Sequence, residues 1–91
     1  FLGLGKLLFS EGPQHFPAAR DQFREAERLT RSGDSALRAE ARYFLSRIET
    51  EGGGKDARLA TNYVEEAIAL DPGPPQYRAQ ACLVRIRFLS K

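Results

Sequence analysis

Few residues of this chain could support catalysis on their own. His15 is the only histidine, and it lies in a turn between Pro13 and Pro17. Cys82 is the only cysteine, and it falls within an apolar segment, where we expect it to be a buried small hydrophobe. A zinc site needs several histidine or cysteine ligands, and a nucleophilic cysteine needs a nearby base. We therefore predict that the protein is not an enzyme and has no metal or cofactor site.

The glycine run at 52–54, followed by Lys55, invites comparison with a phosphate-binding loop. It lacks the GxxxxGK[ST] spacing, and Asp56 stands where the hydroxyl residue that binds magnesium is required. No apolar strand precedes the run, as such a loop would need. We interpret the segment as a turn between two helices.

Arginine is the residue type that most suggests binding. Of the 14 basic residues, only Lys6, Lys55 and Lys91 are lysines. A guanidinium binds a carboxylate through two parallel hydrogen bonds, so arginines gathered on one surface suit an acidic protein segment. The alternative is that arginine is simply the default surface residue of this chain, and the sequence leaves both interpretations open.

The charge pattern argues against nucleic acid as the partner. The net charge is only +2. Acidic residues also interrupt every basic stripe, namely Glu25, Glu27, Glu65 and Glu66. We predict a protein or peptide partner, with an acidic segment as one candidate, and no nucleic acid. A small basic helical nucleic-acid binder is the least favoured alternative.

Helical elements must position these side chains. Apolar residues recur every three or four positions in five segments, which predicts an all-α protein. The expected helices are 1–10, 16–31, 35–51, 56–71 and 75–90. Asp56 is expected to act near the start of the fourth helix as a cap, and Pro72 to end that helix. Gly5 is expected at a close contact between helices.

The second and fourth helices share a pattern. The same spacing of small and apolar residues occurs in both helices, at Ala19, Phe23 and Ala26 in the second and at Ala60, Val64 and Ala67 in the fourth. The pattern recurs after 41 residues. A two-helix unit that repeats at such a distance is typical of a helical solenoid, in which stacked neighbours bury a continuous core.

These residues resemble the tetratricopeptide repeat family. The first-helix pattern is matched by Phe1, Leu4, Gly5 and Leu8, and Pro72 closes the second unit as the family's proline does. Arg31 stands where the first unit should have proline, and the unit is longer than the family's roughly 34 residues. The resemblance implies one domain over residues 1–91, a right-handed helical-hairpin solenoid of about five helices, built from two hairpins and a closing helix.

The resemblance also implies a function. In this family the first helix of each hairpin lines a concave groove that binds a peptide or a partner helix, so the protein is expected to be a protein–protein interaction scaffold. Carried onto this sequence, the groove residues are Lys6, Phe9, Arg42, Ser46, Arg78 and Arg85. Leu2 holds one position of the lysine–asparagine set of the family's chaperone-binding members, so that clamp is not implied.

The bulk properties limit the remaining possibilities. The chain has 91 residues and no methionine, so we expect a piece of a longer protein. No apolar run reaches the roughly 18 residues of a membrane span, so we predict no membrane insertion.

A single cysteine favours the cytoplasm over the periplasm. The apolar ends of the chain leave open a structural or oligomerisation domain, in which exposed apolar faces of the terminal helices meet another copy or another domain.

Overall fold

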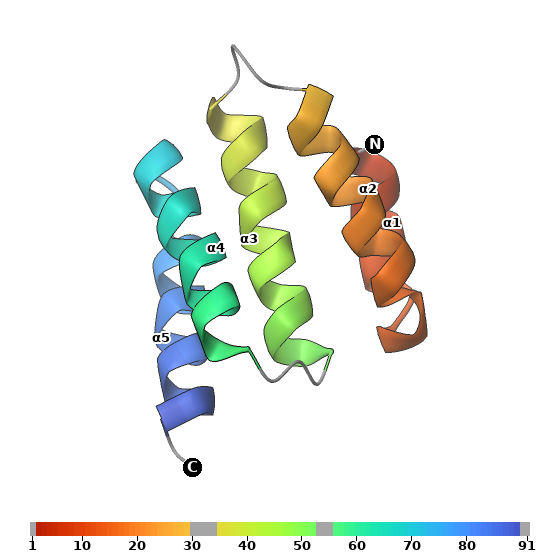
Figure 1. Cartoon of the computed structure of the whole chain (residues 1–91). Helices are drawn as coiled ribbons and strands as arrows, with labels where there is room; N and C mark the ends of the chain where they lie inside the picture. The colour runs from red at the N-terminus through yellow and green to blue at the C-terminus, as the bar shows by residue number, and fades with distance from the viewer. Residues whose placement is uncertain (1, 30–34, 53–55, 90–91) are drawn as a thin grey trace.

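The computed structural model describes residues 2–29, 35–52 and 56–89. These residues form five α-helices, with one 3₁₀ turn (η1, Pro13–His15) between the first two, and they contain no strand. The helices are α1 (Leu2–Ser10), α2 (Phe16–Leu29), α3 (Ser35–Glu51), α4 (Ala57–Leu70) and α5 (Pro75–Leu89). The prediction of an all-α protein with five helices is confirmed (Figure 1). The turns expected at 32–34 and 52–54 lie largely outside the described residues.

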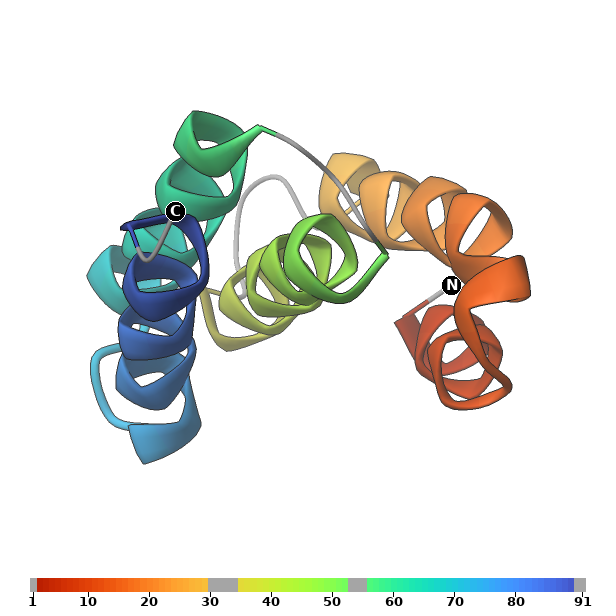
Figure 2. The same ribbon diagram turned by 90° about the horizontal axis from the view of Figure 1, so that it is seen from below.

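Helix α3 occupies the centre of the molecule. Figure 2 shows α1 and α2 to one side of α3, with α4 and α5 to the other. Consecutive helices contact each other, and α3 also contacts α1 and α5. The sequence predicts a single apolar stripe along 35–51, but α3 is buried on several faces. Its buried residues are Ala39, Ala41, Leu45, Ser46, Ile48, Glu49 and Thr50. Three of these, Ser46, Glu49 and Thr50, are polar.

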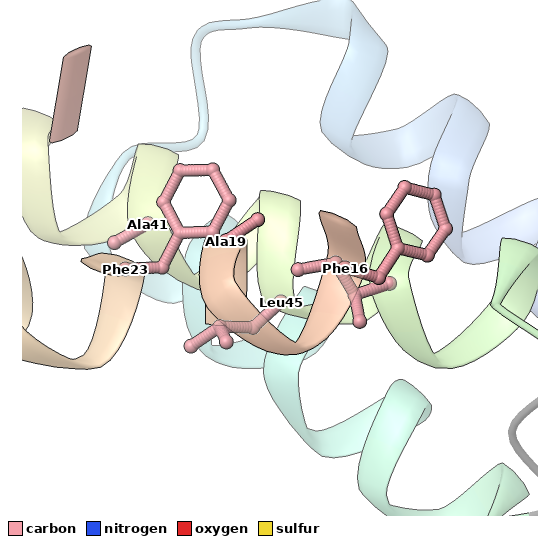
Figure 3. Packing of buried hydrophobic residues seen from close by; sticks show 6 residues of the cluster. Phe16, Ala19, Phe23, Ala41 and Leu45 are labelled. Carbon is pink, nitrogen blue, oxygen red and sulfur yellow. The ribbon is translucent and has the colours of Figure 1, made fainter. Parts of the chain in front are cut away.

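The larger core cluster joins α2 to α3 (Figure 3). Six buried side chains form it: Phe16, Ala19, Phe23, Ala41, Leu45 and Ile48. Aromatic rings extend it, since the ring of Phe23 stacks on that of Phe44 with 5.1 Å between centroids. The alanine spacing predicted for α2 is therefore used at a helix contact.

Gly5 lies at the contact of α1 with α2, as the sequence predicts. Gly5 is buried, and a Cβ atom placed there would lie only 2.8 Å from Cε1 of Phe23. Phe23 is itself fully buried, so its ring cannot move aside cheaply. The close approach of these two helices thus depends on the missing side chain.

A buried polar network joins α3 to α4 and α5. The Ser46 hydroxyl donates to the carbonyl oxygen of Ala60 at 2.9 Å. The Gln80 side-chain amide donates to the hydroxyl oxygens of Ser46 and Thr50, at 3.2 and 3.1 Å. Thr50 in turn donates to carbonyl oxygens of its own helix. Because buried polar groups are costly without partners, this network restricts α5 to one position on α3.

Both predicted ends of α4 are confirmed. The Asp56 carboxylate accepts a hydrogen bond from the Leu59 N–H at 2.9 Å, as an N-cap does. The helix ends at Leu70, and the backbone of Asp71 is extended before Pro72. Within α4, Ala60, Val64 and Ala67 are buried, so the face identified from the sequence is used for packing.

The two glycines of α1 provide a matched test of the packing at Gly5. Nothing lies within 4 Å of a Cβ placed on Gly3. We expect Gly3→Ala to raise the free energy of unfolding by about 0.5 to 1 kcal/mol, because alanine favours the helix. Gly5→Ala should instead lower it by about 1 kcal/mol or more, because overpacking exceeds the helix gain. Urea unfolding followed by circular dichroism measures both, and a stabilised Gly5→Ala variant would contradict the close contact.

Candidate functional site

The six predicted groove residues do not share one surface. Ser46 has no exposed surface and is hydrogen-bonded to Ala60 and Gln80, so its assignment to the groove is wrong. Its face of α3 is covered by α4 and α5. Arg42, one turn earlier, lies between α2 and α4, where it pairs with Glu66.

The other predicted residues are spread over the molecule. Lys6 forms an ion pair with Glu40 of α3. Phe9 is half-buried, and its ring stacks on that of Phe16 at 4.8 Å between centroids. Arg85 lines a small apolar groove of about 210 Å³ between α4 and α5, and Arg78 is exposed.

A basic pocket lies between α2, α3 and α4. Its volume is about 360 Å³, and four arginines dominate its lining. We call it the arginine pocket and define it by Arg24, Glu27, Arg28, Arg38, Arg42, Leu45 and Tyr63. The fully buried Leu45 and the ring of Tyr63 give it an apolar component beside the charges.

Arg42 holds the helices around this pocket together. Its guanidinium pairs with Glu27 of α2 and, at 2.7 Å, with Glu66 of α4. The same group lies 5.7 Å from the ring centroid of Tyr63. Only 18% of the Arg42 side chain is exposed, so its contact with the similarly covered Glu27 is shielded from water, whereas Glu66 is exposed. Arg42 is thus a structural bridge from α2 to α4.

Arg24 and Arg38 differ from Arg42 in having no acidic partner among the residues that the structure describes. Within the described part of the chain, no carboxylate lies within ion-pair distance of either guanidinium. The Nε atoms of Arg38 and Arg42 are also buried without a hydrogen-bond acceptor. Buried donors without an acceptor are rare in proteins.

Arg28 contributes less free charge to the pocket. Its guanidinium hydrogen-bonds Glu25 one turn earlier, and this contact lowers the pKa of the Glu25 carboxyl. Both groups are solvent-exposed, so water screens the pair. Arg24 and Arg38 are thus the arginines of the pocket that have no acidic partner among the described residues.

The sequence carried an unused signal for this pocket. Arg24 and Arg28 are four residues apart on α2, and Arg38 and Arg42 are four apart on α3. Like charges at this spacing lie on the same helix face and repel each other. Two such pairs on adjacent helices concentrate positive charge there, whereas the tetratricopeptide resemblance implies a site on the first helix of each hairpin.

The two residues considered for catalysis, His15 and Cys82, lie in different elements, η1 and α5. Cys82 is exposed, which corrects the prediction of a buried side chain, because the buried face of α5 is the one that carries Tyr77, Gln80 and Val84. His15 lies 4.0 Å from a Glu11 carboxylate oxygen. Among the described residues, no three histidine, cysteine or acidic side chains gather as metal ligands. No helix in the same residues is both long and apolar enough to cross a membrane.

Comparison with known proteins gave no match to a family model, to a curated protein or to a solved structure. The resemblance to tetratricopeptide repeats therefore stays a prediction.

Removing the Arg42 bridge should destabilise the fold. Arg42→Met keeps the aliphatic stem but leaves Glu27 and Glu66 without their shared cation. We expect the free energy of unfolding to fall by about 1 to 2 kcal/mol, between the values typical of exposed and buried ion pairs. Arg58→Met, at an exposed position of α4, is the control and should change it by less than about 0.5 kcal/mol. Equal urea midpoints for the two variants would contradict the bridging role.

Proposed function

We propose that this protein is a protein–protein interaction module that binds an acidic segment of its partner in the arginine pocket. The observation that carries this proposal is the pair Arg24 and Arg38, which face a pocket of about 360 Å³ without acidic partners in the described residues. The proposal keeps the acidic partner suggested by the sequence and moves the site from the α1–α3–α5 side to the α2–α3–α4 side.

A solenoid-like arrangement is part of the proposal. Each helix contacts the next one, and the alternate helices α1, α3 and α5 contact in series. This pattern supports two hairpins followed by a closing helix, as in tetratricopeptide arrays. Repeat units of this kind expose long surfaces on which extended partners bind.

The lining of the pocket favours a peptide with both acidic and apolar side chains. Guanidinium groups bind carboxylates through two parallel hydrogen bonds, and the partly exposed ring of Tyr63 provides apolar surface beside them. Glu27 and Glu66, which pair with Arg42 nearby, would repel a continuous line of phosphates. A short acidic peptide therefore suits the pocket better than a nucleic-acid backbone.

Peptide binding tests this proposal. The probe is a fluorescein-labelled peptide of alternating glutamate and leucine, and the same peptide with glutamine is its uncharged control. Arg24→Gln with Arg38→Gln should weaken binding about tenfold, as expected for loss of charged hydrogen bonds. Arg58→Gln with Arg78→Gln removes the same charge from exposed positions and should leave the affinity within about twofold.

Two results would contradict the arginine pocket. One is equal anisotropy titrations for the two arginine double variants. The other is equal binding of the glutamate and glutamine peptides. Tighter binding of a single-stranded oligonucleotide, with a steep loss of affinity as salt rises, would instead favour the nucleic-acid alternative.

Self-association is a second candidate function, favoured by the exposed face of α5. Leu83 and Ile86 are 57% and 64% exposed. They border a depression of about 450 Å³ between α3 and α5, together with Glu51 and Arg87. An apolar face of this kind can pack on the same face of a second copy about a twofold axis, while the Glu51 carboxylate is already paired with Arg47 of its own helix.

A single charge on α5 tests self-association. Ile86→Glu places a carboxylate in the exposed apolar face and should shift the protein to monomer across about 10 to 500 µM, a range in which weak dimers dissociate. Ala79→Glu, at another exposed position of α5, is the control and should leave the mass distribution unchanged. Sedimentation velocity measures both variants. A parent protein that is monomeric over the whole range would rule out this function for the chain.

A further inference from the structure

A second pocket lies on the other side of α3 from the arginine pocket. Its volume is also about 360 Å³. Helix α1 contributes Lys6, α3 contributes Glu40 and Tyr43, and the α4–α5 connection and the start of α5 contribute Asp71 and Tyr77. We call it the tyrosine pocket. Three helices therefore converge on it, and Figure 2 shows α1 and α5 flanking α3 at this side.

The charge of the tyrosine pocket is opposite to that of the arginine pocket. Lys6 already pairs with Glu40, so its charge is compensated. The Asp71 carboxylate accepts one hydrogen bond, from the Gly73 N–H at 3.4 Å. Among the described residues, no cation lies within ion-pair distance of Asp71. The lining thus retains one uncompensated negative charge.

The burial and the unpaired hydroxyl of Tyr77 are a second observation on this pocket, independent of its charge. Only 4% of the residue is exposed, yet its side chain lines the pocket and its hydroxyl has no hydrogen-bond partner among the described residues. Burial, reinforced by Glu40 and Asp71, raises its pKa to about 12. The hydroxyl oxygen is not one of the fully buried unpaired atoms, so it reaches the surface of the pocket, where it is available to a partner supplied from outside.

The same fold already shows how these aromatic rings hold a guanidinium. Arg47 lies over the ring of Phe9 at 4.7 Å from its centroid, and near those of Tyr43 and Phe44 at 5.7 and 5.9 Å. Its Nε donates to Glu51 at 2.7 Å. Aromatic faces beside a carboxylate are thus an arginine-binding arrangement within this chain. The tyrosine pocket repeats that combination with Tyr43, Tyr77 and Asp71 and without an internal arginine in its lining.

We propose that the tyrosine pocket is a second binding site, which takes an arginine side chain from an extended segment of a partner protein. The guanidinium would hydrogen-bond the Asp71 carboxylate, offer a further N–H to the Tyr77 hydroxyl and rest against Tyr43. A guanidinium suits these partners better than an ammonium, because it is planar and carries several donors in a fixed arrangement. This site does not depend on the arginine pocket.

A pair of peptides that differ in one group tests the proposal. The probe is a capped alanine peptide with one central arginine, and its control has citrulline, which keeps the shape and loses the charge. Asp71→Asn keeps an acceptor for the Gly73 N–H and should weaken binding of the arginine peptide about fivefold or more. Asp21→Asn removes the same charge from an exposed position of α2 and should leave the affinity unchanged. Two-dimensional amide NMR titrations give affinities and locate the shifted signals.

Several results would overturn this site. Equal binding of the citrulline and arginine peptides would exclude recognition of the charge at Asp71. Equal affinity of Asp71→Asn and Asp21→Asn for the arginine peptide would exclude it too. Amide shifts confined to α2 and α4 would place the peptide elsewhere. If Asp71→Asn proves poorly folded by circular dichroism, Tyr43→Phe provides the second variant, since it keeps the ring on which the guanidinium rests. This variant should retain binding, and a loss would contradict stacking as the contact.

Discussion

The burial of α3 on several faces is the constraint on which the other features depend. A helix that packs on α1, α2, α4 and α5 has few positions left for contact with water. Polar residues on its covered faces must therefore be paired internally. Ser46 and Thr50 bind Gln80, and the buried Glu49 pairs with Arg20 at 3.3 Å. These pairings hold α2 and α5 at fixed positions on α3, because an unpaired polar group there would be costly.

The central position of α3 also separates two pockets of opposite charge. Arg38 and Arg42 extend from α3 toward α2 and α4, whereas Glu40 and Tyr43 line the side that faces α1 and α5. Residues two apart on a helix point in nearly opposite directions, which is why one helix lines both pockets. A single chain of net charge +2 can thus offer a basic and an acidic surface at once.

The candidate site was only partly predictable from the sequence, because some arginines form structural ion pairs and others have no acidic partner among the described residues. The sequence predicts Arg42 as a groove residue, whereas in the structure it bridges Glu27 and Glu66. Arg24 and Arg38 are not among the predicted residues, although their spacing to Arg28 and Arg42 marks two repulsive pairs. Whether an arginine is paired depends on acidic residues far away in the sequence, so local pattern alone cannot identify the free ones.

The sequence by itself determined the local structure. Apolar spacing, Asp56 as a cap and Pro72 as a stop follow from short-range sterics and hydrogen bonding, and the structure agrees with each. Gly5 was expected at a helix contact, but its neighbour Phe23 is set by the packing of α2. Tertiary structure alone decided that α3 is central, that Ser46 is buried and that Cys82 is exposed. The physical reason is that helical periodicity gives the apolar faces of each helix but not which neighbours cover its other faces. Those neighbours determine which charges are paired and which are free to bind.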